Sequence, residues 1–222
     1  MDAKVKRALD ASLKAYAANE NIDAALIQES LYRIFDAEDT FMGKVVQLDE
    51  LFDDHQRFEE LREHYFDLLM INFFAEDVQK LEEDYLDSEE WEAIEEETID
   101  RGSELLNVLL YLRECADDEV EPSLEDFLKE FLLVEEDEFQ DEYEIYEVVI
   151  ANQLLMESNY EQIAQVANGL SEQDELQELF YPLMSFFLEP QPNQEQLDEY
   201  ANSATNKSLS LALYQLIVQF NK

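Results

Sequence analysis

Turn-forming residues are scarce in this chain, whose 222 residues include 3 Gly and 4 Pro. This scarcity argues against β-sandwiches and other turn-rich folds, which need glycine and proline at their many turns. No apolar run approaches the roughly 18 residues needed to span a bilayer. The bases Lys4, Lys6 and Arg7 are not followed by the apolar segment of a signal peptide. We therefore expect a cytoplasmic protein that does not enter a membrane.

Cysteine and histidine are almost absent as well. Cys115 is the single cysteine, so no disulfide can form within the chain, which is typical of a reducing compartment. His55 and His64 are nine residues apart on one predicted helix, so their side chains leave opposite faces and cannot share one metal ion. The 3 Gly form no phosphate-binding loop. The sequence therefore predicts no cofactor, with Cys115 and His55 as core residues.

Positive charge is the third shortage. Lys and Arg number 14 against 56 Asp and Glu, for a net charge of −42. Residues 1–35 are neutral, residues 36–149 carry −34, and residues 150–222 carry −8. Phosphate groups would be repelled, so we expect no direct nucleic acid or membrane partner; a basic protein or peptide is the natural one. Adaptation to a salt-rich medium is the alternative, although it should have acidified residues 1–35 too.

Apolar residues are plentiful, at 46% of the chain, and aromatic residues make up 12%. Such a chain can bury a sizeable core, and apolar residues recur at the three- and four-residue spacing of helices. We predict an all-α fold, an antiparallel helical array of roughly nine or ten helices. The expected helices cover about 2–18, 21–35, 48–74, 88–112 (interrupted near 102–103), 123–132, 142–157, 160–170, 173–189, 194–204 and 208–221. Asn21 should cap the second helix, residues 40–44 should form a break, and Pro182 should kink its helix or mark its first turn.

The C-terminal third nearly repeats itself with a period of 34 residues. Residues 161–188 and 195–222 share six identical positions: Glu161/Glu195, Gln162/Gln196, Ala167/Ala201, Asn168/Asn202, Leu179/Leu213 and Phe186/Phe220. A period of this length with helical patterning is typical of a stacked two-helix unit. We therefore divide the chain into an acidic helical region, 1–135, and a helical-repeat region, 136–222; one continuous domain, 1–222, is the alternative.

This repeat resembles the tetratricopeptide family over about residues 142–222. The family's large–small pair in the first helix is matched by Ile150-Ala151 and Met184-Ser185, and Tyr160-Glu161 opens the second helix. The sequence departs from the pattern at Ile163 and Leu197, where a small residue is expected, and it lacks the closing proline. The resemblance implies a concave, peptide-binding surface lined by first helices, with Val148, Asn152 and Phe186 on it, and a last helix that caps the stack. The alternative is that these residues form interhelical core.

Two acidic runs are the candidate partner-binding sites. The first run contains Glu82, Glu83, Asp84, Asp87, Glu89, Glu90, Glu92, Glu95 and Glu96, and ends with Glu97. The second contains Glu135, Glu136, Asp137 and Glu138, followed by Tyr143. A helix through residues 82–97 would carry one charge per roughly 2.4 Å, against about 1.7 Å along duplex DNA. Such a helix could occupy the DNA-binding groove of a basic protein, although solvated surface is the simpler interpretation. Trp91 is expected to anchor the core.

A magnesium-dependent nucleoside triphosphate pyrophosphatase is the enzymatic alternative. That all-helical family binds Mg²⁺ with Glu-Glu-x-x-Glu followed by Glu-x-x-Asp, and this chain resembles it at Glu60, Glu63, Glu97 and Asp100. The separation of the two motifs is longer than in the family. A structural or oligomeric scaffold is the third hypothesis. The main prediction remains a non-catalytic protein-binding module with a strongly acidic surface.

Overall fold

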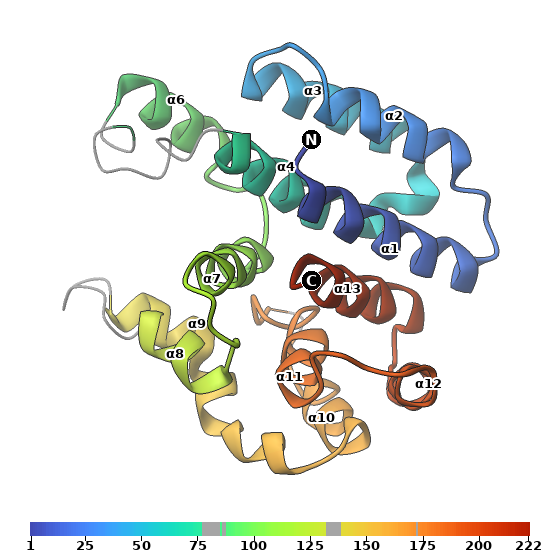
Figure 1. Cartoon of the computed structure of the whole chain (residues 1–222), viewed down its shortest axis with the longest axis vertical. Helices are drawn as coiled ribbons and strands as arrows, with labels where there is room; N and C mark the ends of the chain where they lie inside the picture. Colours follow the sequence, from blue (N-terminus) through green and yellow to red (C-terminus); the bar gives the residue numbers. More distant parts are fainter. Residues whose placement is uncertain (77–84, 86–87, 132–138, 172) are drawn as a thin grey trace.

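The computed structural model describes residues 1–76, 85, 88–131, 139–171 and 173–222, and this part of the chain is all-α. It contains no strand, in agreement with the prediction (Figure 1). The α-helices are α1 (Ala3–Glu20), α2 (Ala25–Phe35), α3 (Phe41–Asp54), α4 (Arg62–Glu76), α6 (Glu89–Thr98), α7 (Leu105–Asp117), α8 (Leu124–Phe131), α9 (Phe139–Ala151), α10 (Tyr160–Ala167), α11 (Phe180–Leu188), α12 (Gln194–Ser203) and α13 (Lys207–Phe220). Two 3-10 helices accompany them, η1 (Gln56–Leu61) and η3 (Gln153–Glu157).

The C-terminal helix α13 lies at the centre of the fold. It packs along α1 and against α11, and it also contacts α7 and α12 (Figure 1). Its buried residues, among them Leu213, Tyr214, Leu216 and Ile217, cover most of the circumference of the helix. The expectation that this helix caps a stack is therefore wrong, because the N-terminal helix covers the side that would have been the exposed end.

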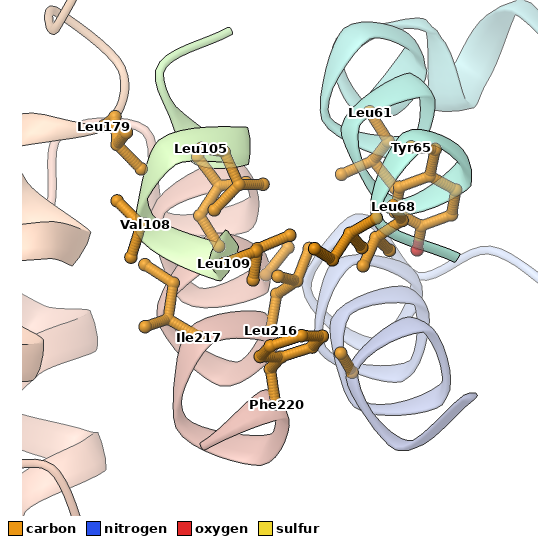
Figure 2. Close-up of a cluster of buried hydrophobic side chains, with 14 of the residues drawn as sticks. Leu61, Tyr65, Leu68, Leu105, Val108, Leu109, Leu179, Leu216, Ile217 and Phe220 are labelled. Atoms are coloured by element: carbon orange, nitrogen blue, oxygen red, sulfur yellow. The ribbon is translucent and has the colours of Figure 1, made fainter. Parts of the chain in front are cut away.

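One hydrophobic cluster joins helices from both ends of the chain. Leu109 of α7 lies beside Leu216 of α13, and Tyr65 of α4 lies on the opposite side of the same cluster (Figure 2). The described helices of residues 1–135 and of residues 136–222 therefore bury their apolar faces against each other. Cys115 is 4% exposed within α7, which confirms its prediction as a core residue.

The predicted helix over 48–74 is two α-helices with η1 between them. His55 ends α3 with φ −126° and ψ 51°, and its Nδ1 lies 2.9 Å from the Leu51 carbonyl oxygen. This local bond competes with the helical backbone and lets the chain turn. Both Phe52 and Phe58 then reach the core, at 0% and 4% exposure. His55 is hydrogen-bonded, but it is half-buried at a helix end, so its prediction as a core residue is wrong.

Other helix boundaries follow from local capping. Asn21 ends α1 in the left-handed conformation, φ 52°, which asparagine tolerates well, so its expected role as the cap of the second helix is wrong. The break expected at 40–44 is misplaced: it covers residues 36–40, because Thr40 caps α3 with its side chain and the helix begins at Phe41. Pro182 lies in the first turn of α11, where proline needs no hydrogen bond to the preceding turn. The predicted interruption near 102–103 separates α6 from α7.

Helices α10 to α13 pack as neighbours around a tyrosine cluster. Helix α10 contacts α11 and α12, and both of these contact α13. Tyr181 stacks on Tyr200 with 4.4 Å between ring centroids, and Tyr160 and Tyr214 bring their hydroxyl oxygens within 3.1 Å. Burial raises the pKa of the Tyr160 and Tyr214 hydroxyls, so both stay protonated and can serve as hydrogen-bond donors.

Candidate interaction surface on helix α6

Helix α6 forms from a strongly acidic segment because its first turn suits negative charge. Ser88 is the N-cap, and its Oγ accepts a hydrogen bond of 3.2 Å from the Trp91 backbone N–H. Glu89, Glu90 and Glu92 occupy the first turn, where the positive end of the helix dipole favours carboxylates. The acidic sequence is therefore compatible with a short helix, provided that one side of it is anchored.

Two side chains anchor α6 to the body of the protein. Ile94 is 6% exposed. Trp91 is half-buried, with its ring centroid 5.3 Å from that of Phe74 and 6.3 Å from that of Tyr85. Trp91 thus packs against the hydrophobic core, as predicted. With its apolar side occupied in this way, α6 presents its remaining sides to solvent.

The outward sides of α6 carry six exposed glutamates. They are Glu89, Glu90, Glu92, Glu95, Glu96 and Glu97. Among the described residues, none of their carboxylates takes part in an ion pair or a side-chain hydrogen bond. Six charges along ten helical residues correspond to about 2.5 Å per charge, somewhat sparser than the roughly 1.7 Å of duplex DNA. The described part of the first acidic run is therefore a dense, unpaired line of negative charge.

Two described arginines, Arg101 and Arg62, do not neutralise this line, because other carboxylates hold them. Arg101 donates to Asp49 at 2.9 Å and to Glu63 at 3.0 Å. Arg62 lies 2.5 Å from Asp53 and 2.9 Å from Glu59. Both guanidinium groups thus bind carboxylates from α3, η1 and α4, and neither pairs with a glutamate of α6.

The connector from α6 to α7, residues 101–103, is fastened to α4 by polar side chains. Glu63 accepts a hydrogen bond of 2.8 Å from the Gly102 N–H. Asp67 accepts one of 2.6 Å from the Ser103 hydroxyl. Gly102 has φ +85°, and a Cβ at this position would come within 2.6 Å of Asp67 Oδ1. Glycine is thus required both by the backbone conformation and by the close approach of the carboxylate.

His64 extends this polar cluster toward the C-terminal region. Its Nδ1 lies 3.1 Å from Ser103 Oγ, and its Nε2 lies 3.2 Å from Glu178 Oε2. Burial raises the pKa of the Asp67 carboxyl to about 7, and the hydrogen bond from Ser103 opposes this shift. The bond to His64 lowers the pKa of Glu178. The four groups form a continuous chain from a carboxyl that is 1% exposed to one at the surface.

Several residues predicted to bind a partner are placed differently. Phe186 is fully buried, so it belongs to the interhelical core and not to a peptide groove. Phe186 is buried because its helix, α11, packs against both α13 and α10. Asn152, half-buried, donates its side-chain N–H to the Val148 carbonyl oxygen at 2.8 Å. Tyr143 lies on α9. The remaining predicted residues, Glu82, Glu83, Asp84, Asp87, Glu135, Glu136, Asp137 and Glu138, lie outside the described residues.

The residues of the magnesium alternative do not form a metal site in the described part of the chain, where no group of three or more possible ligands gathers. Glu60 accepts hydrogen bonds from Tyr16, at 2.8 Å, and Asn206, at 2.9 Å. Glu63 binds Arg101 and the connector, whereas Glu97 and Asp100 are exposed. Glu60 and Glu63 are therefore already occupied by protein donors.

Comparison with protein-family models, with curated proteins and with solved structures finds no match for this chain. Within the described residues, no helix combines the length and the apolar character that crossing a membrane requires.

Sequence reasoning missed the polar cluster around Asp67, yet a signal for it was present. Asp67 lies in a stretch of α4, from Tyr65 to Ile71, in which every residue is buried. A carboxylate on a helix that is apolar on all sides must find a buried partner. Its partners, Ser103 and His64, could not be inferred because 36 residues separate Asp67 from Ser103.

Proposed function

We propose that this protein is a non-catalytic binding module that uses the acidic sides of α6 to bind a basic protein or peptide. The observation that carries the proposal is the row of six exposed, unpaired glutamates on a helix fixed by Trp91 and Ile94. Charges held on a packed helix lose little conformational entropy on binding, and glutamates spread over the outward sides of α6 suit a basic surface that surrounds those sides. The charge spacing makes mimicry of a DNA backbone the sharper form of the proposal.

The packing of α10 to α13 supports a second part of the proposal, a tetratricopeptide-like array behind this surface. Helix α10 contacts both α11 and α12, and each of these contacts α13, a side-by-side packing that stacked two-helix units would also produce. In this proposal the array supplies a stable body and the acidic helix supplies the contact. The proposal does not include a peptide groove lined by Phe186, because that side chain is buried.

Binding of arginine- and lysine-rich peptides and of basic DNA-binding proteins tests the proposal. The test variant changes Glu92, Glu95, Glu96 and Glu97 to Gln. The control variant changes four exposed glutamates of the C-terminal region, Glu157, Glu161, Glu195 and Glu199, to Gln, so both variants lose the same charge. We expect binding to weaken about tenfold in the test variant, because several exposed ion pairs of up to about 1 kcal/mol each are lost.

The control should bind within about twofold of the wild type, and binding should weaken as salt rises. Duplex DNA should compete for the basic protein if the charge row mimics DNA. Equal weakening in both variants would show that net charge alone is responsible. Absence of salt-sensitive binding to every basic partner would refute the proposal.

A further inference from the structure

A second surface, away from α6, has the opposite electrostatic character. It is an open groove of about 470 Å³ between α1, α12 and α13. Figure 1 shows α12 and α6 on opposite sides of the molecule. The apolar part of its lining consists mainly of small residues: Ala11, Ala15, Ala18, Leu197, Ala201 and Leu211. Small side chains allow a guest helix to approach closely, because interaxial distance depends on the side chains at the contact.

The cations of this groove are free, unlike those beside α6. Lys14 and Lys207 line it and are exposed, and neither joins an ion pair among the described residues. The acid in the lining, Asp198, accepts a hydrogen bond of 2.9 Å from the Gln194 side chain. By contrast Lys6, on another side of α1, is held by Asp10 at 2.7 Å. In a chain with four times as many acids as bases, two unpaired lysines facing one groove are a local exception.

Positive charge continues along the same side of α1. Lys4, Arg7, Ala11, Lys14 and Ala18 follow one another at three- and four-residue spacing, which places them on one face of the helix. Lys4 also lies over the ring of Phe220 at 5.9 Å, beside the C-terminal end of α13. The groove is therefore the middle of a strip that pairs a basic edge with a small, apolar floor.

We propose that this groove binds an amphipathic helix of a partner protein, one with leucine-type residues on one face and carboxylates beside them. The apolar residues would lie over the alanines of α1 and α12, and the carboxylates would pair with Lys14 and Lys207. Helix-in-groove recognition of this kind uses anchors at three- and four-residue spacing. At physiological salt the screening length is about 8 Å, so repulsion from carboxylates that lie farther from the groove than this is largely screened. The local lysines then decide the interaction.

A second copy of this chain fits the groove less well. The described acidic helices α6 and α8 turn their apolar residues, such as Ile94 and Phe127, into their own core. They therefore have no apolar stripe to place over the alanines. Two whole molecules of net charge −42 also repel each other more strongly than one molecule repels a short helix. Charge complementarity thus favours a separate, acidic helical partner.

The experiment uses two fluorescent peptides designed as helices of about four turns with the same leucine stripe, one flanked by glutamates and the other by lysines. Binding to the full chain is measured by fluorescence anisotropy at about 0.15 M salt. We expect the glutamate peptide to bind more tightly than the lysine peptide at this groove. The double variant Lys14→Glu and Lys207→Glu should weaken its binding at least about tenfold, and Ala15→Trp, which obstructs the floor, should do the same.

The matched control is Arg33→Glu with Lys129→Glu, which changes the charge equally at two exposed positions outside the groove. It should leave binding within about twofold of the wild type, as should the glutamine variant of α6. Circular dichroism establishes that every variant folds. The proposal is overturned if the lysine peptide binds equally well at the groove or if neither peptide binds. It is also overturned if the substitutions of Lys14 and Lys207 leave binding of the glutamate peptide unchanged. Two other results would also overturn it. One is a dimer, detected by light scattering, that is lost in Ala15→Trp; the other is binding to anionic vesicles that depends on the groove.

Discussion

At the scale of single residues, Asp67 shows how one buried carboxyl can organise a connection between distant segments. Its carboxyl accepts hydrogen bonds from the hydroxyl and the backbone N–H of Ser103, and Ser103 Oγ in turn lies beside His64 Nδ1. His64 continues the contact to Glu178, 114 residues away in sequence. One buried carboxyl on α4 is thus linked through Ser103 and His64 to a carboxylate at the surface of the C-terminal region.

The Asp67 carboxyl makes stability depend on pH in a defined direction. Its pKa is raised from 3.8 to about 7, chiefly because burial disfavours the charge, although Ser103 and His64 favour it and Glu63 opposes it. Between these values the folded protein binds a proton that the unfolded chain has released. The stability contributed by this group is therefore complete below about pH 4 and is lost as pH rises through about 7. We expect the free energy of unfolding to fall with pH more steeply in the wild type than in Asp67→Asn.

Urea unfolding at about pH 5 and pH 8 measures this difference, which should be on the order of 2 kcal/mol. The repulsion among the other carboxylates changes with pH in both proteins, so it cancels in the comparison. Asp54→Asn, at an exposed position of α3, is the control and should keep the wild-type slope. An identical slope in Asp67→Asn and the wild type would contradict the prediction.

At the scale of the element, α6 depends on a narrow apolar side for its attachment. Its glutamates face solvent, so Trp91 and Ile94 provide the apolar burial that fixes it. The connector then holds its C-terminal end through Glu63 and Asp67. The charge row would lose its rigidity if either attachment failed, and binding through α6 would then carry a larger entropic cost.

The two isoleucines around the end of α6 allow a matched test of this attachment. Ile94 is 6% exposed and Ile99 is 78% exposed. We expect Ile94→Ala to lower the free energy of unfolding by roughly 2–4 kcal/mol, because it removes buried methylene and methyl groups, and Ile99→Ala to change it by less than about 0.5 kcal/mol. Trp91, the single tryptophan, reports locally on the packing through its fluorescence. Equal effects of the two substitutions would contradict the placement of α6.

At the scale of the whole molecule, repulsion among the carboxylates opposes folding and burial of the apolar side chains favours it. The net charge of −42 disfavours any compact state, and the described bases of residues 36–149 bind carboxylates or backbone groups at several positions instead of screening the surface. The single hydrophobic cluster that joins α1, α4, α7 and α13 compensates for this repulsion. Folding stability should therefore respond strongly to the screening of charge by salt.

Raising the sodium chloride concentration should raise the melting temperature markedly, with most of the gain between about 0.01 M and 0.2 M. The physical reason is that the screening length falls from about 30 Å to about 7 Å over this range, so that repulsion between distant carboxylates disappears. Differential scanning calorimetry measures the effect. Potassium chloride, as the control, should give the same curve, because screening does not depend on the identity of the cation. A melting temperature that is independent of salt would contradict this account of the surface.

The sequence by itself determined what depends on local composition and spacing. Helical periodicity predicted the all-α class, Ser88 predicted the start of α6, and Gly102-Ser103 predicted the interruption before α7. Some local signals are compatible with two structures. Asn21 can begin one helix or end another, and His55 can continue a helix or break it. The density of negative charge on α6 was readable directly from the sequence, but only the structure shows that Arg101, four residues after Glu97, binds Asp49 and Glu63 instead.

Tertiary structure alone decided which apolar faces meet and where buried charges find partners. Nothing local indicates that α1 covers α13, so the last helix was expected at an end and lies in the centre. Burial of Phe186 and the chain from Asp67 to Glu178 depend on contacts between residues far apart in sequence. The groove beside Lys14 and Lys207 arises in the same way. Such contacts are selected by the packing of whole helices, which the periodicity of any single helix does not specify.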